Sequence, residues 1–388
     1  MSTGKRIYFD YGCFGPMDKD VQDAVLHWIR CQNTHGPRAR TPLSYFFEGS
    51  SNSTLANWPG IEPALQYFGE ALNVSAESIL TTQNTTTALL NSVELLTSVR
   101  GHKNVVISCS EHPVVRDSLK RLSKRGELNV VEISSRTPDD LFDYKLFSDE
   151  LKKLDLAEPP IIVISHVLWD TGEVIDLRKA LARLNDCSVV ADGAHAFGQI
   201  SLASVPWNIV DCYCTCGHKW VRGPISLGLL LINDDELRDR YLDAFDVSFL
   251  TYPHGARIDS ERFFASVPIE KFVGTALAIR NMNLLGIDSI RKKTLKLREL
   301  LVSRVCSGLV TPLPHGTETG IVSINLRDSQ AASEVVTILD KKYKLMVSET
   351  TPGRIRICLS STLSQECVER LGRALAELGL GSEHIALE

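Results

Sequence analysis

The sequence predicts an α/β protein in which a large three-layer αβα domain, built on a mostly parallel sheet, is followed by a small α+β C-terminal domain. Two observations support this prediction. From about residue 75 to residue 235, short apolar strands alternate with amphipathic helical segments, the pattern of a parallel sheet with helices on both faces. After residue 268, a long helical segment precedes a shorter set of strands and helices.

The predicted strands of the first region are short runs of apolar residues. Residues 160–164 form an unbroken apolar run, as expected for a strand that is buried on both faces. Cys212, Cys214 and Cys216 alternate along another run and therefore share a face, where we expect them to pack in the core. Further strands are expected at residues 79–81, 105–108, 130–133, 188–191, 211–216 and 227–232.

Helical spacing of apolar residues separates these strands. Ala88, Leu89, Val93 and Leu96 line one face of a helix that is predicted over residues 85–99. Other helices are expected at 112–124, 177–184, 268–305, 331–343 and 366–378, and the last three enclose strands at 321–325 and 354–359.

Residues 33–60 are rich in Pro, Gly, Ser and Asn and show no clear period, which predicts a long loop. Arg38 and Arg40 lie in this loop. They are candidates either to meet an anionic substrate or to remain solvated surface charges.

Composition excludes several classes of protein. Hydrophobic residues make up 44% and charged residues 23%, as in ordinary globular proteins. The net charge of −5 does not favour binding to a nucleic acid or to an anionic membrane. The N-terminus lacks the apolar stretch of a signal peptide, and the longest apolar run, near residues 227–232, is too short to span a bilayer. The ten cysteines form no CxxC pair. We therefore expect a cytoplasmic protein with free thiols.

Ligands of such sheets bind beyond the carboxyl ends of the strands, and reactive side chains follow several predicted strands. His112, Asp192, His195, His218 and Lys219 all occupy such positions. Thr85, Thr86 and Thr87 open a helix, where hydroxyls and backbone N–H groups either bind an anion or only cap the helix. Each residue alone has a structural explanation: a buried histidine, a capping aspartate or a solvated lysine. Their common location at one edge predicts a functional site.

This set of side chains matches the requirements of pyridoxal 5′-phosphate. A lysine amine forms a Schiff base with the aldehyde, and a carboxylate pairs with the protonated pyridine nitrogen. Hydroxyls at a helix start hold the phosphate, and an imidazole lies on the ring. The chain has neither GxGxxG after its first strand nor GxxxxGK[ST], so dinucleotide and P-loop sites are not expected.

The most specific sequence is ADGAHAFGQ at residues 191–199, followed by Gly217-His218-Lys219-Trp220. With Lys219 placed 27 positions after Asp192, the chain resembles the class V aminotransferase branch of fold type I pyridoxal-phosphate enzymes over most of its length. That branch includes cysteine desulfurases, kynureninase-like enzymes, isopenicillin N epimerase-like proteins and C–S lyases. The resemblance implies a large cofactor-binding domain at 21–265, a linking helix and small domain at 266–388, and a segment at 1–20 that associates with the small domain.

The resemblance also implies roles for single residues. Lys219 would hold the cofactor and then move the substrate α-proton, and Asp192 would keep the ring nitrogen protonated. His112 would stack on the cofactor ring, and His195 would form a hydrogen bond with the 3′-oxygen of the cofactor. The phosphate would be bound by Thr85, Thr86, His218 and Cys216, the last in place of a serine that many relatives have.

Two further implied roles concern the substrate and the partner subunit. Ser266 resembles a residue that reaches the phosphate of the other subunit, so a homodimer with sites near its interface is expected. Arg356 resembles the arginine that binds the substrate carboxylate, for which a guanidinium is suited. We expect Arg354 on the opposite strand face from Arg356, or out of register with it.

Differences from other members of the family narrow the choice of reaction. Desulfurases carry a cysteine in the mobile loop before that arginine, whereas residues 347–353 contain none. Leu168 or Trp169 occupies the place of an asparagine near the 3′-oxygen, and His166 and Trp169 either shape a substrate pocket or only pack. We expect β-elimination from a small amino acid or conjugate, of the C–S lyase type. Epimerase, aminotransferase and decarboxylation-dependent chemistry remain alternatives, as does a binding or scaffold relative without the cofactor, although both Lys219 and Asp192 are present.

Overall fold

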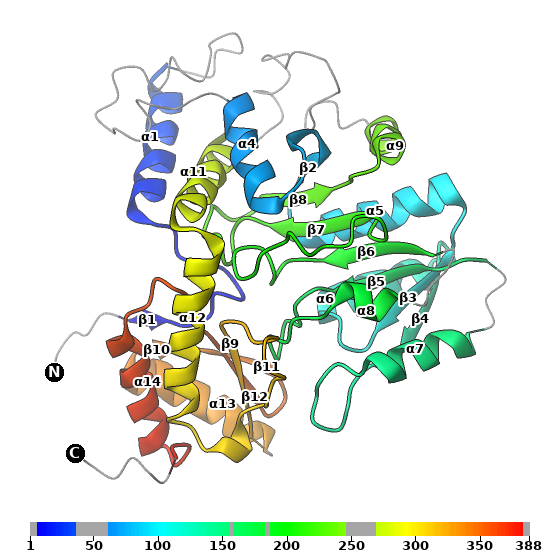
Figure 1. Cartoon of the computed structure of the whole chain (residues 1–388). Helices are drawn as coiled ribbons and strands as arrows, with labels where there is room; N and C mark the ends of the chain where they lie inside the picture. The colour runs from blue at the N-terminus through cyan, green and yellow to red at the C-terminus, as the bar shows by residue number, and fades with distance from the viewer. Residues whose placement is uncertain are drawn as a thin grey trace.

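The computed structural model describes residues 6–35, 61–154, 158–182, 187–245, 269–326 and 328–382. Figure 1 shows a large unit, in which helices cover a central sheet, above a small unit that contains the C-terminal helices. Three buried apolar clusters correspond to this arrangement, one on each face of the large sheet and one in the small unit.

The large sheet has seven strands in the order β2-β8-β7-β6-β5-β3-β4. β8 runs antiparallel to both of its neighbours, and every other adjacent pair is parallel. The mostly parallel sheet predicted from the strand–helix alternation is therefore confirmed. The strands are β2 (Ile79–Thr82), β3 (Asn104–Ser108), β4 (Asn129–Ile133), β5 (Ile161–Ser165), β6 (Ser188–Asp192), β7 (Cys212–Cys216) and β8 (Gly228–Leu231).

Helices bury both faces of this sheet, which explains its unbroken apolar strands. Alternate residues of β3 illustrate the two faces, because Val105 and Ile107 join one cluster while Val106 joins the other. The first cluster contains side chains of α5 (Thr85–Arg100), α6 (Pro113–Lys124) and α9 (Asp235–Phe245). The second contains side chains of α1 (Lys19–His35), α4 (Ile61–Leu72), α7 (Tyr144–Lys153), α8 (Leu177–Leu181) and α11 (Ile269–Leu285).

The small unit is an antiparallel sheet in the order β11-β12-β9, covered by helices. Its elements are α12 (Ile287–Val302), a 3₁₀ turn η2 (Ser307–Leu309), β9 (Ile321–Asn325), α13 (Ser329–Ile338), a π turn η3 (Leu339–Tyr343), β11 (Ser348–Thr351), β12 (Arg354–Cys358) and α14 (Gln365–Glu377). Near the start of the chain, β1 (Ile7–Tyr8) pairs in parallel with β10 (Leu345–Met346). The N-terminal strand therefore lies beside the small unit. The predicted boundary at residues 265–266 lies outside the described residues.

The single helix predicted over 268–305 is wrong, because the chain forms two helices there. Gly286 separates α11 from α12 with a backbone φ of 75°, a left-handed conformation that suits glycine. The break allows α11 to pack on the large sheet while α12 packs on the small one, as Figure 1 shows. The helix predicted over 331–343 begins at Ser329 and ends at Tyr343 as predicted, but its last five residues, Leu339–Tyr343, are π-helical.

Candidate active site

Lys219 lies in the loop after β7, and its Nζ is 3.0 Å from Nε2 of His195. His195 lies in the loop after β6, whose last residue is Asp192. β6 and β7 are parallel neighbours, so their carboxyl ends meet at one edge of the sheet. The structure thus brings together the three residues that the sequence placed after these strands.

The Asp192 carboxylate is held in the core at the base of this cluster. The residue is 7% exposed, and Oδ1 accepts a 2.8 Å hydrogen bond from the backbone N–H of Ala194. Burial raises the pKa of Asp192, and the positive charge of Lys219 acts in the opposite direction. A protonated pyridine nitrogen beside this carboxylate would favour its ionised form.

Two imidazoles at the site are neutral at physiological pH. Burial and the charge of Lys219 lower the pKa of His112 to about 4, and the same two causes bring the pKa of His195 well below its usual value. Nδ1 of His112 accepts from the N–H of Val114 at 3.2 Å, so the proton of this neutral ring is on Nε2. His112 caps α6 and meets Trp169 edge to face, with ring centroids 4.9 Å apart.

The start of α5 and the end of β7 carry the groups that are expected to bind the phosphate. Asn84 caps the helix by accepting from the N–H of Thr87, and the buried hydroxyl of Thr85 has no hydrogen-bond partner among the described residues. Burial raises the pKa of the Cys216 thiol, but His218, Lys219 and Thr85 around it outweigh this effect, so its pKa is lowered. Thr86, the next residue of the helix, is half-buried.

A close backbone contact fixes the loop that carries Lys219. The N–H of Gly15 donates to the carbonyl of His218 at 2.7 Å. A Cβ at residue 15 would lie 2.1 Å from the backbone oxygen of Lys219, so only glycine fits there. The N-terminal segment therefore packs directly against the lysine loop, a contact that the sequence pattern did not reveal.

Arg356 is 6% exposed on β12, and its guanidinium reaches the large unit. Nη2 donates to Oδ1 of Asp10 at 2.7 Å, and Nη1 donates to the carbonyl of Trp169 at 3.1 Å. Nε is buried and has no hydrogen-bond partner among the described residues. Two of the five guanidinium N–H groups are thus used, which leaves the Nε hydrogen and one hydrogen on each terminal nitrogen for a ligand.

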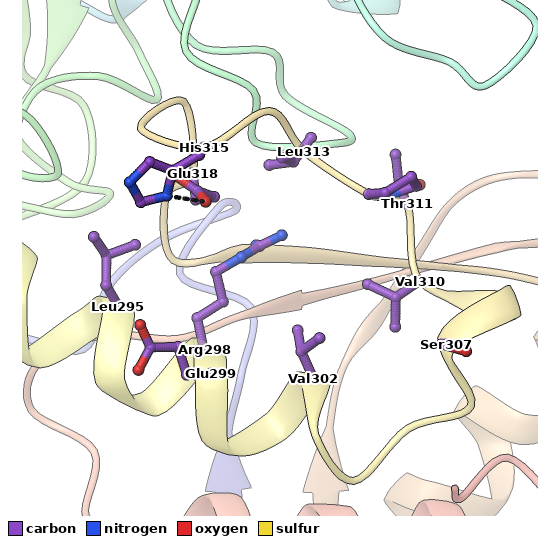
Figure 2. Close-up of a pocket in the computed structure, with 11 residues that line it drawn as sticks. Leu295, Arg298, Glu299, Val302, Ser307, Val310, Thr311, Leu313, His315 and Glu318 are labelled. Atoms are coloured by element: carbon purple, nitrogen blue, oxygen red, sulfur yellow. Dashed lines mark ion pairs between the residues drawn. The ribbon is translucent and has the colours of Figure 1, made fainter.

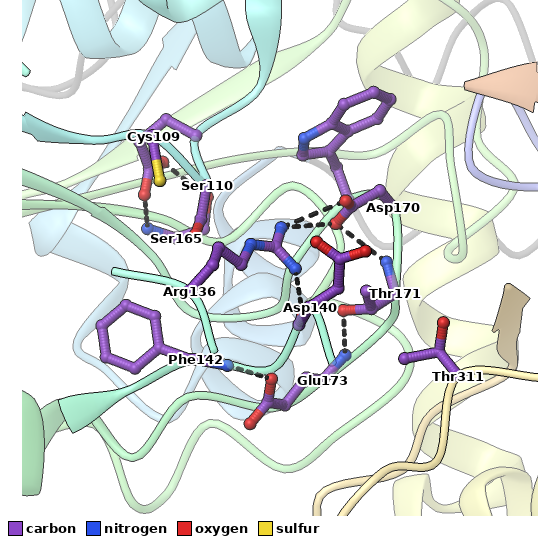
Figure 3. Close-up of polar contacts among 12 residues, drawn as sticks. Cys109, Ser110, Arg136, Asp140, Phe142, Ser165, Asp170, Thr171, Glu173 and Thr311 are labelled. Carbon is purple, nitrogen blue, oxygen red and sulfur yellow. Dashed lines mark hydrogen bonds and ion pairs between the residues drawn. The ribbon is translucent and has the colours of Figure 1, made fainter. Parts of the chain in front are cut away.

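The expectation that Arg354 lies on the opposite face from Arg356, or out of register with it, is wrong. Residues i and i+2 of a strand share a face, and both guanidiniums reach the turn at residues 169–170. Arg354 donates to Asp170 at 2.5 Å and also pairs with Asp140. Figure 3 shows that Arg136 reaches Asp170 as well, at 2.8 Å, so Arg354 belongs to a buried ion network.

Of the remaining sequence expectations, the structure places the one for His166. Nδ1 of His166 lies 2.9 Å from the hydroxyl of Tyr213, which favours the packing role for this histidine. Ser266, Arg38 and Arg40 lie outside the described residues.

Two buried residues near the site were missed by sequence reasoning. Glu111 precedes His112 and accepts two hydrogen bonds from Ser165. Gln199 donates to the carbonyl of His195 and accepts from the N–H of Gly320 in the small unit. The position of Glu111, next to a candidate histidine, was the available signal for it.

The residues present fit pyridoxal 5′-phosphate. Among the described residues, buried polar atoms without a partner occur where the cofactor would need donors: at Thr85 Oγ1 and His218 Nδ1 near the expected phosphate site, and at His195 Nδ1, on the ring whose Nε2 contacts Lys219. The buried Asp192 carboxylate is a group that could pair with the ring nitrogen. By contrast, the described part of the chain contains no group of three or more His, Cys, Asp or Glu side chains that could hold a metal ion. None of the described helices is both long and apolar enough to cross a bilayer.

Comparisons with known proteins identify the family of this chain. The family model for Aminotransferase class-V matches residues 58–369. Isopenicillin N epimerase of Streptomyces clavuligerus is 27% identical over 243 residues, which cover 56% of this chain and 60% of that protein. A probable cysteine desulfurase of Methanothermobacter thermautotrophicus is 24% identical over 382 residues, which cover 89% of this chain and 92% of that protein.

Solved structures show the same fold. The complex of the cystine C–S lyase C-DES with its product cysteine persulfide superposes with a TM-score of 0.70 at 19% identity, covering 97% of this chain and 98% of that one. A NifS-like protein gives a TM-score of 0.69, also at 19% identity, covering 96% of this chain and 99% of that one. These likenesses confirm the predicted fold class. Because the family match spans most of the sequence, the chain belongs to the class V aminotransferase family, and its cofactor is pyridoxal 5′-phosphate.

Proposed function

We propose that this enzyme catalyses β-elimination from a sulfur-substituted amino acid, releasing a thiol. One observation carries the choice of reaction. The stretch at residues 347–353 contains no cysteine, and much of it forms strand β11, paired with β12. Cys358, on β12, is fully buried, and burial raises its pKa to about 11. A cysteine that could accept sulfur from the substrate is therefore missing from this part of the chain. The sulfur instead leaves as part of the substrate's leaving group.

The C–S bond is the preferred target because two kinds of relative are named for sulfur amino acids, the cystine C–S lyase and the cysteine desulfurases. Pyridoxal phosphate, when bound, supplies an electron sink for the pair released at Cα. Lys219 Nζ is the base that takes the Cα proton, and His195 orients this amine through their 3.0 Å contact.

His112 donates a hydrogen bond to the leaving group. Its ring is neutral, and Val114 fixes Nδ1 as an acceptor, so the proton is held on Nε2. The Cα–H and Cβ–S bonds break, and the proton that Lys219 Nζ takes from Cα passes to the departing sulfur, which leaves as a thiol. Uptake of one water then yields a 2-oxo acid and ammonium.

Arg356 binds the substrate α-carboxylate in this proposal. Asp10 and the carbonyl of Trp169 hold two of its nitrogens, which orients the guanidinium and leaves Nε to face the substrate. The carboxylate therefore binds side-on, through Nε and the remaining hydrogen on Nη2.

The experiment incubates the holoenzyme with L-cystine and with S-ethyl-L-cysteine. We expect pyruvate, ammonium and a thiol or persulfide in equal amounts, and no product from Lys219→Ala. Alanine formed from L-cysteine in a parallel incubation would instead identify a desulfurase and contradict the proposal.

Epimerisation is the second candidate, because the 27% identical relative is named as an epimerase. Incubation of the same substrates in D₂O distinguishes it. Deuterium at Cα of recovered substrate with inverted configuration, without pyruvate, would establish epimerisation in place of elimination.

A further inference from the structure

A second pocket lies in the small unit, away from the lysine site. It has a volume of about 410 Å³ and is bounded by α12, η2 and the loop at residues 310–318 (Figure 2). This volume lies within the range of small-molecule sites. None of the residues that we assign to the cofactor or substrate lines it.

A buried charge lies in this pocket. Arg298 is 7% exposed, and Figure 2 shows its side chain extending from α12 toward the loop that carries Leu313 and His315. Both of the hydrogen bonds that its guanidinium makes to described residues come from Nη1, to the carbonyls of Thr319 and Ile321. A guanidinium has five N–H donors, so those on Nη2 and Nε are left for a ligand acceptor.

Two carboxylates face the same pocket. Glu318 accepts from the N–H of Gly316 at 2.6 Å, lies 3.8 Å from Nδ1 of His315, and attracts Arg298 without a direct ion pair. Glu299 is the second carboxylate. A purely anionic ligand on Arg298 would be repelled by these groups, whereas a ligand that also carries a cation would meet both signs of charge.

The rest of the lining is mainly apolar. Leu295 and Val302 come from α12, and Val310 and Leu313 come from the facing loop. Such walls favour a hydrocarbon side chain of a few carbons, because its burial removes apolar surface from water.

We propose that this pocket is a second amino-acid site, which takes a zwitterion with an apolar side chain. The ligand carboxylate binds Nη2 and Nε of Arg298, the ammonium faces Glu318, and the side chain packs on Leu295, Val302 and Leu313. The proposal does not depend on the reaction proposed above.

The pocket is connected to the catalytic lysine through hydrogen bonds. Arg298 holds the carbonyls on either side of Gly320, whose N–H donates to Gln199 at 2.8 Å. Gln199 in turn donates to the carbonyl of His195 at 2.7 Å, and His195 contacts Lys219. A ligand that holds Arg298 therefore acts on the segment that braces His195.

Calorimetric titration of the holoenzyme with three matched probes tests the proposal. L-leucine carries both charges, 4-methylpentanoate lacks the ammonium, and 3-methylbutylamine lacks the carboxylate. We expect L-leucine to bind at least about 10-fold more tightly than either analogue. Equal or tighter binding of an analogue, or no binding of L-leucine, would overturn the proposal.

Variants locate the bound leucine. Leu313→Trp fills the pocket and should abolish binding, while Leu284→Trp, at a residue 80% exposed on α11, should leave it unchanged. Glu318→Gln removes the ammonium's partner with little change of shape and should weaken binding about 10-fold, compared with Glu334→Gln on α13. Binding that survives Leu313→Trp but is lost in Arg356→Lys would place leucine at the catalytic site and refute a second site.

Discussion

Glu111 is joined to Ser165 by two hydrogen bonds, from the backbone N–H to Oε1 at 2.9 Å and from the hydroxyl to Oε2 at 2.6 Å. Glu111 directly precedes His112, and Ser165 pairs with Asp192 in the sheet. The contact thus connects the loop that carries His112 with strand β6, which ends at Asp192. Burial raises the pKa of Glu111 to about 8, so the carboxyl is mostly protonated at neutral pH.

Replacement of Glu111 by Gln is expected to remove a pH dependence of stability. The raised pKa means that the folded protein binds a proton which the unfolded chain releases near pH 4.5, so wild-type stability falls as the pH rises from about 5 to 8. The difference in unfolding free energy between Glu111→Gln and the wild type should therefore shift in favour of the variant, by up to about 1.4 kcal/mol per pH unit across that window. Urea unfolding at several pH values measures this difference.

Glu132→Gln is the control for that series. Partial burial would raise the pKa of Glu132, but hydrogen bonds from Lys120 and Arg116 outweigh it and lower the pKa. The stability that Glu132 contributes is present above its unfolded pKa and is lost as the pH falls, the opposite direction. Parallel pH profiles for Glu111→Gln and the wild type would show that Glu111 is ionised in the folded state.

Asp192→Asn is expected to inactivate the enzyme while the fold persists. An asparagine oxygen can still accept from the N–H of Ala194, so the turn after β6 is retained. The charge that favours a protonated ring nitrogen is lost, and we expect kcat to fall at least about 100-fold. Steady-state kinetics and the melting temperature should be compared with those of Asp211→Asn, whose carboxylate pairs with Arg100 away from the site. Full activity in Asp192→Asn would remove Asp192 from the cofactor site.

Cys216→Ser is expected to strengthen binding of the cofactor through its phosphate. The thiol lies beside His218 and Thr85, and a hydroxyl is a stronger hydrogen-bond donor than a thiol. Dialysis followed by absorption spectroscopy would measure cofactor retention, which should rise in Cys216→Ser and fall in Cys216→Ala. Identical retention in both variants would mean that residue 216 does not reach the phosphate.

Arg356→Lys and Arg354→Lys are expected to fail in different ways. A lysine at 356 cannot hold Asp10, the carbonyl of Trp169 and a substrate carboxylate at once, so KM should rise about 10- to 100-fold. Arg354 instead anchors Asp170 and Asp140, so Arg354→Lys should lower the melting temperature with a smaller change in KM. The reverse pattern would assign substrate binding to Arg354.

Sequence reasoning was most accurate where local pattern and sheet geometry sufficed. Asp192 and Lys219 follow apolar strands, and the ends of parallel strands meet at one edge, so their approach could be predicted. The same reasoning failed at Gly286, because helical periodicity continues across a one-residue break. It also assigned Arg354 to the wrong face, although the period of a strand predicts the shared face.

By itself, the sequence determined the αβα architecture, the cofactor and the cluster of Lys219, His195 and Asp192, because these depend on short-range patterns. Only the tertiary structure decided which groups hold Arg356, because Asp10 lies 346 positions away in the chain. It also decided that Arg298 lies in a pocket with two of its nitrogens unpaired among the described residues. Contacts of this kind depend on how separate elements dock, and that docking is set by the packing of the whole core rather than by any local run of residues.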